Sequence, residues 1–323
     1  SYLSISIPVL LAVFAFCKNW FSRILSGILL IAAGCNILIA NSDSVFLGIF
    51  AGVVVVTILA FMQGRLRYSS FAVFLLFVGN LVLGFINKYG HTRYDKKRGG
   101  LAIALNRLDI AFVLCGAALL VFAVVCVCNW KLGTRVAAWN KKKIVLIVCG
   151  ACVALGVIGI IVLAVTGSSL LTFNDKWGSY RGYIWRKIVE VYGDAPFVNK
   201  LFGYGNESVR VTLKAACYNE MVQVTGKVYD NAHNELLQYL FTTGIVGLLS
   251  YLALVGSSIV YMFKHAKEHA WISVCLAATV GYFAQSILNL NQPITTPLFF
   301  VFMAMGVGTV NYCRRVKELE KRA

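Results

Sequence analysis

Long apolar runs alternate with short polar segments along nearly the whole chain. A helix needs roughly 17 to 25 mostly apolar residues to cross the hydrocarbon core of a bilayer. The alternating pattern typical of membrane barrel strands does not occur in these runs. The runs therefore predict about nine membrane-spanning helices, at 3–17, 24–40, 45–62, 71–86, 110–129, 144–166, 236–263, 271–288 and 297–312.

Composition supports a membrane protein, because 59% of the residues are hydrophobic, only 13% are charged and the mean hydropathy is +0.76. In lipid, backbone polar groups must be satisfied within their own segment, which favours helices. We therefore expect an all-α, polytopic transmembrane bundle. The first run has no basic flank and no cleavage site, so it is not read as a signal peptide. We expect the chain to be the C-terminal part of a longer protein with further N-terminal spans.

The positive-inside rule gives this bundle an orientation. Sixteen of the 30 Lys and Arg residues fall in five segments, which this rule places in the cytoplasm. The other 14 lie in two segments on the opposite side, 87–109 and 166–235. This predicts four parts: spans within 1–165, an extracytoplasmic loop at 166–235 containing short helices, spans within 236–312, and a basic cytoplasmic tail at 313–323.

The outer loop 87–109 contains six Lys and Arg residues, Arg93 and Arg98 among them, against two Asp residues. Such a cluster favours an anionic partner, such as a pyrophosphate, a phospholipid headgroup or an acidic glycan. A solvated loop, or an error in the assigned topology, would explain the same charges.

The long loop 166–235 opens with an amphipathic pattern, with apolar residues at 184, 185, 188, 189 and 192. This spacing predicts a helix along the membrane interface. Arg181, Arg186 and Lys187 would then lie where a lipid pyrophosphate emerges from the bilayer. The alternative is that these cations merely extend into the headgroup region.

Two further features of the loop suggest chemistry. Gly203 and Gly205 permit a tight turn with close backbone approach. His233 follows Asp230 and Asn231, either of which can cap a helix, so we expect the histidine in the first helical turn. There the helix dipole and the arginines would lower its pKa and keep it neutral, as a general base requires. Glu235 is a candidate orienting or second acid/base group.

Cysteines and metal ligands add little to the picture. Nine of the ten cysteines lie in or at the ends of apolar runs, and only Cys217 lies in the long loop. No disulfide is therefore expected, and no Cys/His ligand set predicts a metal site.

The string Ala-His-Asn-Glu-Leu-Leu at 232–237, followed by Gly-Ile-Val-Gly-Leu at 244–248, resembles a signature of one family. This family is the O-antigen ligase and O-antigen or capsular polysaccharide polymerase superfamily of membrane glycosyltransferases. The order of parts is similar too: Arg181, then a Gly-x-Gly turn, then His233. The resemblance covers roughly residues 41–310. Many members have Ser-Arg where this chain has Asp43-Ser44, so no phosphate-binding arginine is assigned there.

The resemblance implies a metal- and cofactor-independent enzyme of the bacterial inner membrane, acting at its extracytoplasmic face. It would transfer a glycan from undecaprenyl pyrophosphate to the sugar hydroxyl of an acceptor glycan or glycolipid. His233 would be the catalytic base and Arg181 would stabilise the leaving group. Pyrophosphate-binding residues would be Arg186, Lys187, Arg93 and Arg98, and supporting residues Asn234, Glu235, Gly203 and Gly205.

Three functions remain open. The first is a polymerase of lipid-linked repeat units, and the second is an O-antigen ligase that moves a finished polymer to the lipid A core. The third, from a different functional class, is a flippase or exporter of the same lipid-linked glycan. The absence of charged residues inside the spans argues against transport. Nothing in the sequence indicates a nucleic-acid partner.

Overall fold

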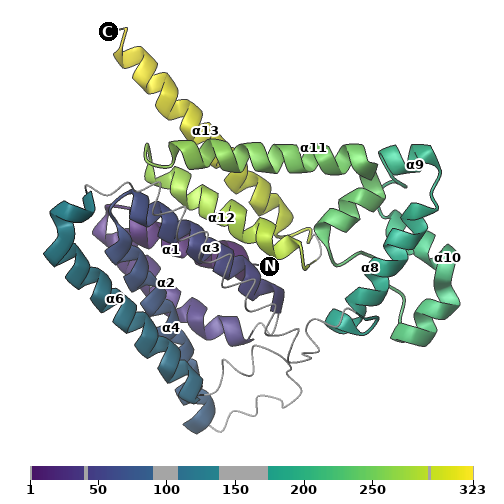
Figure 1. Ribbon diagram of the computed structural model, residues 1–323, viewed down its shortest axis with the longest axis horizontal. Coiled ribbons are helices and arrows are strands. Elements are labelled where there is room, and N and C mark those ends of the chain that lie inside the picture. Colours follow the sequence, from purple (N-terminus) through teal and green to yellow (C-terminus); the bar gives the residue numbers. More distant parts are fainter. Residues whose placement is uncertain (1, 40–42, 90–107, 138–173, 290–291, 323) are drawn as a thin grey trace. The chain divides into compact units, whose positions relative to one another are not determined.

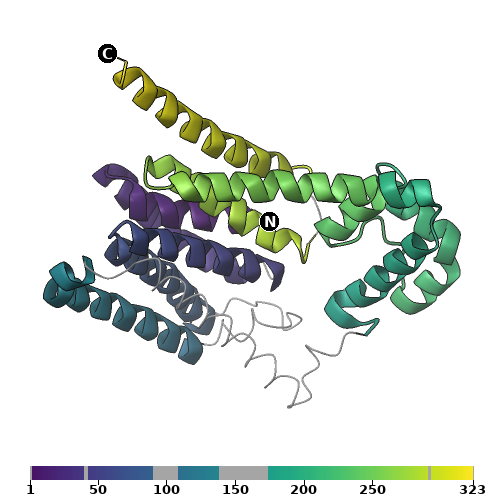
Figure 2. The ribbon, with the colours of Figure 1, turned by 45° about the horizontal axis from the view of Figure 1, so that its top comes forward.

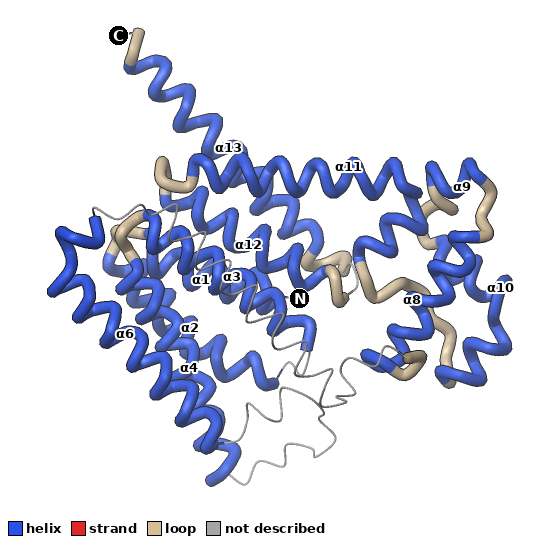
Figure 3. The backbone as a smooth tube through the Cα atoms, in the orientation of Figure 1, coloured by secondary structure: helices blue, strands red, loops and turns tan. Residues whose placement is uncertain are grey.

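The computed structural model describes residues 2–39, 43–89, 108–137, 174–289 and 292–322. These residues form helices and their connections, without a strand (Figures 1 and 3). The helices are α1 (Tyr2–Phe16), α2 (Trp20–Ile39), α3 (Asp43–Met62), α4 (Leu66–Tyr89), α6 (Leu108–Ala137), α8 (Trp177–Gly193), α9 (Phe197–Phe202), α10 (Ser208–Thr225), α11 (Glu235–His265), α12 (Ala270–Ser286) and α13 (Thr296–Glu320). The expected all-α class is confirmed for this part of the chain.

Eight of the nine predicted spans coincide with helices. Six of the helices, α2, α3, α4, α6, α11 and α13, are long and apolar enough to cross a membrane. Two more, α1 and α12, are apolar but have only 15 and 17 residues. The predicted span at 144–166 lies outside the described residues, so the number nine stays a prediction.

The chain divides into two compact units, each described here by itself. The first contains α1 to α6, α12, α13 and the end of α11. Small residues bring its helices close together: a Cβ atom added at Gly34 would collide with the Leu76 carbonyl oxygen, and one at Gly79 with that of Ile31. Close approach of this kind at small residues is typical of helix packing in membranes.

The second unit contains α8, α9, α10 and the first part of α11. Its core is formed by nine buried residues: Tyr183, Ile184, Ile188, Val209, Leu213, Met221, Tyr229, Ala232 and Phe241. The amphipathic helix expected from the 184–192 pattern is present as α8. Its apolar face, however, packs against protein, since Ile184 and Ile188 are fully buried. This face is covered by α10 and the segment before α11. The expected position of α8 along the membrane interface stays a prediction.

Helix α11 is 31 residues long and is interrupted at Gly244, whose φ of 68° and ψ of −172° are not helical. Beyond the interruption, residues 245–265 form a continuous helix of 21 residues. At a rise of 1.5 Å per residue this part is about 31 Å long, close to the thickness of a bilayer core. Residues 245–265 are therefore long enough by themselves to cross a bilayer core.

Candidate active site

His233 lies immediately before α11, in a left-handed backbone conformation with φ of 49°. Helix α11 begins directly after Asn234. The Asn234 side-chain oxygen accepts a hydrogen bond from the Leu237 N–H at 3.0 Å. Asn234 is thus the N-cap. The prediction that Asp230 or Asn231 caps the helix and that His233 belongs to its first turn was wrong. Asn234 is the N-cap because its side chain reaches a free N–H group of the first helical turn.

Side chains from several directions fix the backbone around His233. The Asn231 side-chain oxygen accepts from the His233 N–H at 3.0 Å. Gln238 accepts from the Ala232 N–H at 2.9 Å, and the Trp185 indole N–H of α8 donates to the Ala232 carbonyl oxygen at 2.8 Å. The segment is therefore held against both α8 and α11, which restricts where the imidazole can point.

The imidazole packs edge-on against the Tyr229 ring, with ring centroids 5.7 Å apart and planes at 80°. Its Nδ1 atom is buried and has no hydrogen-bond partner among the described residues. Burial, and then the positive charges of Arg181 and Lys227, hold the pKa of His233 below its ordinary value, although Asp230 opposes them. The imidazole is therefore neutral at neutral pH and able to accept a proton.

Arg181 follows a left-handed turn formed by Gly178, Ser179 and Tyr180 inside the segment assigned to α8. The Tyr229 hydroxyl donates to the Ser179 carbonyl oxygen at 3.0 Å and so ties this turn to the residue that packs on His233. The structure thus brings Arg181 and His233 into one neighbourhood, close enough for the guanidinium to lower the imidazole pKa.

Backbone strain is concentrated at the same place. Four non-glycine residues in the described part of the chain have positive φ. Two of them, Ser179 and His233, contact Tyr229, and a third, Tyr180, directly follows Ser179. Left-handed conformations cost non-glycine residues about 1–2 kcal/mol each. Such strain is retained where the surrounding structure enforces it, and it is frequent at functional sites.

Lys227 is a residue of this neighbourhood that the sequence analysis missed. Its ammonium nitrogen lies 4.8 Å from the centroid of the Tyr229 ring, and its charge acts on His233. No motif includes this lysine. The available signal was its position six residues before His233, in the segment that returns to the membrane.

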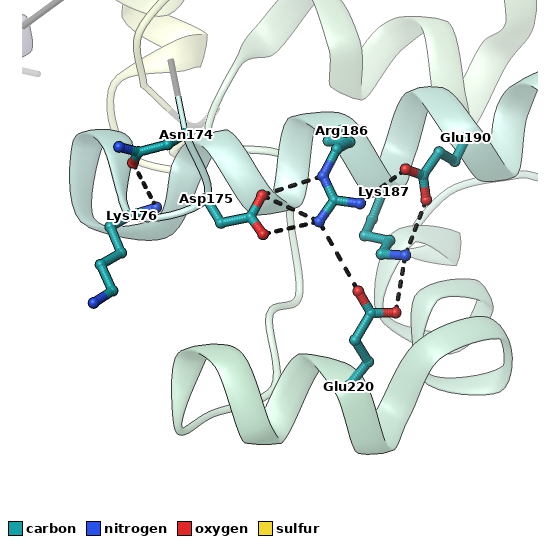
Figure 4. Close-up of polar contacts among 7 residues, drawn as sticks. All are labelled: Asn174, Asp175, Lys176, Arg186, Lys187, Glu190 and Glu220. Atoms are coloured by element: carbon teal, nitrogen blue, oxygen red, sulfur yellow. Dashed lines mark hydrogen bonds and ion pairs between the residues drawn. The ribbon is translucent and has the colours of Figure 1, made fainter. Parts of the chain in front are cut away.

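Arg186 and Lys187 have carboxylate partners instead of an open face (Figure 4). Arg186 binds both oxygens of Asp175, with a shortest distance of 3.0 Å, and contacts Glu190 at 2.9 Å. Lys187 contacts Glu190 and Glu220, each at 2.9 Å. We call these five residues the α8–α10 ion cluster.

The α8–α10 ion cluster holds two cations and three carboxylates, a formal net charge of −1. Hydrogen bonds from Lys187 and Arg186 keep the pKa of Glu190 below its ordinary value, so its carboxylate is ionised at neutral pH. A site of net negative charge repels an anion. The predicted binding of pyrophosphate by Arg186 and Lys187 stays a prediction, and the geometry favours a structural role in joining α8 to α10.

The supporting residues differ in how they act. Glu235 is fully buried, and the Tyr251 hydroxyl donates to its carboxylate at 3.3 Å. Tyr251 in turn stacks on Tyr239, with ring centroids 4.2 Å apart. Glu235 thus occupies the first turn of α11 at its positive end, where the helix dipole favours a carboxylate.

Gly203 and Gly205 contact α11. The Tyr204 and Gly205 N–H groups donate to the carbonyl oxygens of Phe241 and Thr242, both at 3.0 Å. These carbonyls precede the interruption at Gly244. A Cβ at Gly203 would collide with Thr242, and one at Gly244 with Leu201. The turn therefore packs on α11 just before the interruption. The backbone N–H groups of the turn form hydrogen bonds with this part of α11.

Arg93 and Arg98 lie outside the described residues, and their predicted role stays a prediction.

Residues 98–252 match the family model described as O-antigen ligase. The match includes α8 to α10, His233 and the interruption of α11, and it is shorter than the 41–310 expected from the resemblance. No curated protein matches the chain. The match confirms the resemblance found in the sequence, and the apolar helices agree with a membrane enzyme of this type. Across residues 98–252 the chain is thus similar to the O-antigen ligase family of membrane glycosyltransferases.

Proposed function

We propose that the protein transfers a glycan from a polyprenyl pyrophosphate, most simply undecaprenyl pyrophosphate, to a sugar hydroxyl of an acceptor. The observation that carries this proposal is the grouping of a neutral His233 with the positive charges of Arg181 and Lys227. Such a group can accept a proton and stabilise an anion within one site.

In the proposed reaction the acceptor oxygen attacks the anomeric carbon of the donor sugar, and its proton passes to the His233 imidazole. The bond from the anomeric carbon to the pyrophosphate oxygen breaks, and the electron pair leaves with the pyrophosphate. Arg181 and Lys227 stabilise the negative charge that develops on this leaving group. The imidazolium then releases its proton to solvent.

We assign the pyrophosphate to Arg181 and Lys227, and give Arg186 and Lys187 the structural role of holding α8 on α10. The acid–base and anion-binding groups then come from different elements. Arg181 is on α8, Lys227 follows α10, and His233 precedes α11. We place this site at the extracytoplasmic face, because the positive-inside rule puts the segments around it on that side.

Among the transferases, we propose a polymerase that extends lipid-linked repeat units. A ligase is the second candidate, because the matching family model carries that description. The two differ in the acceptor, so product length separates them. A ladder of products on a gel indicates polymerisation, and a single shift indicates ligation to a lipid A core acceptor.

The direct test uses purified protein with a lipid-pyrophosphate glycan donor and measures released polyprenyl pyrophosphate. We expect His233→Ala and Arg181→Ala to reduce release at least about 100-fold, the range lost with a catalytic base or a transition-state contact. Matched controls are His269→Ala and Arg210→Ala, both at exposed residues, which should keep full release.

Two outcomes would contradict the proposal. One is release by His233→Ala equal to that of His269→Ala. The other is movement of the donor across vesicle membranes without a new glycosidic bond, which would indicate an exporter. Arg186→Ala should lower the melting temperature of the protein. A selective rise in the donor KM of this variant in the release assay, at unchanged stability, would instead indicate that Arg186 binds the donor.

A further inference from the structure

Helix α9, Phe197–Phe202, exposes most of its apolar surface although it lies in a folded unit. Phe197 is 74% exposed, Val198 65% and Phe202 62%, and none of its six residues is buried. Half of this short helix therefore consists of large apolar side chains that the described residues of the second unit leave mostly uncovered.

Several contacts fix α9 to α11. The turn that follows α9 hydrogen-bonds to Phe241 and Thr242, and Gly203 and Gly244 let the two backbones touch. The Tyr192 hydroxyl of α8 also donates to the Lys200 carbonyl oxygen at 2.6 Å. The exposed side chains are thus presented on a fixed helix rather than on a loose loop.

The exposed surface of α9 adjoins the start of a candidate membrane span. Its Leu201–Phe202 backbone lies against Gly244, where the 21-residue part of α11 begins. Figures 1 and 2 both show α9 beside this end of α11. The next residues of α11 also expose apolar side chains, Ile245 by 37%, Val246 by 45% and Leu249 by 57%. Apolar surface therefore continues from α9 onto a helix whose composition fits lipid.

We propose that α9 is a membrane-interface anchor, with Phe197, Val198 and Phe202 inserted among lipid chains at the end of the α11 span. Lys200, on the same helix, can extend its ammonium group to the lipid phosphates while its methylene groups stay in apolar surroundings. Large exposed apolar residues beside a basic one are typical of helices that lie in the bilayer surface. The proposal does not depend on the glycosyl transfer assigned to the second unit.

Site-directed photo-crosslinking in the native membrane tests this placement. A benzoylphenylalanine is introduced separately at Phe197 and at Phe202, where high exposure leaves room for the larger ring. Val246 in the span serves as the lipid-facing reference. Tyr218 of α10, an aromatic residue 44% exposed in the same unit, serves as the aqueous reference. After irradiation, lipid adducts are counted by mass spectrometry.

We expect lipid adducts at positions 197 and 202 at about the yield found at 246, and at least about fivefold above the yield at 218. Adduct yields at 197 and 202 no higher than at 218 would overturn the proposal. Crosslinks from these two positions to a second copy of the chain, in place of lipid, would overturn it as well.

Discussion

His233 keeps an unfavourable backbone conformation because its neighbours leave no alternative. Its N–H is bound by Asn231, the preceding residue is held by Trp185 and Gln238, and the next residue caps α11. Three to four such hydrogen bonds, at a net ~1 kcal/mol each, offset the free-energy cost of one residue in the left-handed conformation. The strain places the imidazole on Tyr229, where it is partly buried beside two cations.

Replacing Lys227 by Met should shift the pH dependence of transfer. The Lys227 charge lowers the pKa of His233, so removing it raises that pKa toward the ordinary value. Because the base must be neutral, activity is lost as the pH falls through this pKa, and the acidic limb of the rate profile should move to higher pH. The measurement is kcat/KM for polyprenyl pyrophosphate release against pH.

Lys214→Met on α10 is the matched control for this shift, because Lys214 is exposed and its ammonium lies over Tyr218 instead. Its acidic limb should coincide with that of the unmodified protein. A Lys227→Met profile that is lower at every pH without any displacement would show that Lys227 does not act on His233.

At the scale of elements, the interruption of α11 depends on two glycines, one on each side of the contact between α11 and the end of α9. Gly203 and Gly244 both have positive φ, and both lie where a Cβ would strike the other segment. The carbonyls freed by the interruption are satisfied by the Tyr204 and Gly205 N–H groups. A helix break in an apolar environment is stable only when such partners exist.

Gly244→Ala should therefore destabilise the protein by at least about 2 kcal/mol, from strain at positive φ and from collision with Leu201. Gly256→Ala, in the same helix with no atom within 4 Å of the added Cβ, should be neutral or stabilising by up to about 1 kcal/mol. Thermal unfolding of both variants in detergent measures the difference. Equal melting temperatures would mean that the interruption contributes little to stability.

At the scale of the whole molecule, the distribution of basic residues predicts the side on which each segment lies. The end of α13 and the residues after it contain Arg314, Arg315, Lys317, Lys321 and Arg322. This tail should remain in the cytoplasm. The residues proposed for catalysis should lie on the opposite side.

Reporter fusions check this orientation. A green fluorescent protein fused after Ala323 should fluoresce, and alkaline phosphatase fused there should be inactive, since it folds only outside the cytoplasm. Alkaline phosphatase inserted in the exposed segment at Asn206 and Glu207 should be active. The reverse pattern would place His233 on the cytoplasmic side and remove the proposed access to an exported donor.

The sequence alone determined the helical membrane class, the position of most apolar helices and the family resemblance. Hydrophobicity and short motifs are local properties, and lipid forces each apolar segment to satisfy its own backbone. The motif also led to His233 and Arg181, which are 52 residues apart in the sequence and which the fold brings together. Their predicted roles remain to be tested by the variants above.

Only the tertiary structure decided what surrounds these residues. Lys187 of α8 is joined to α10 because Glu220, on that helix, lies 2.9 Å from its ammonium group. Gly203 and Gly205 pack on α11 because Gly244 interrupts that helix 41 residues after Gly203. Lys227 belongs to the site because its ammonium group lies over the ring of Tyr229. These features depend on contacts between segments far apart in the sequence, and no local pattern of side chains specifies such a contact.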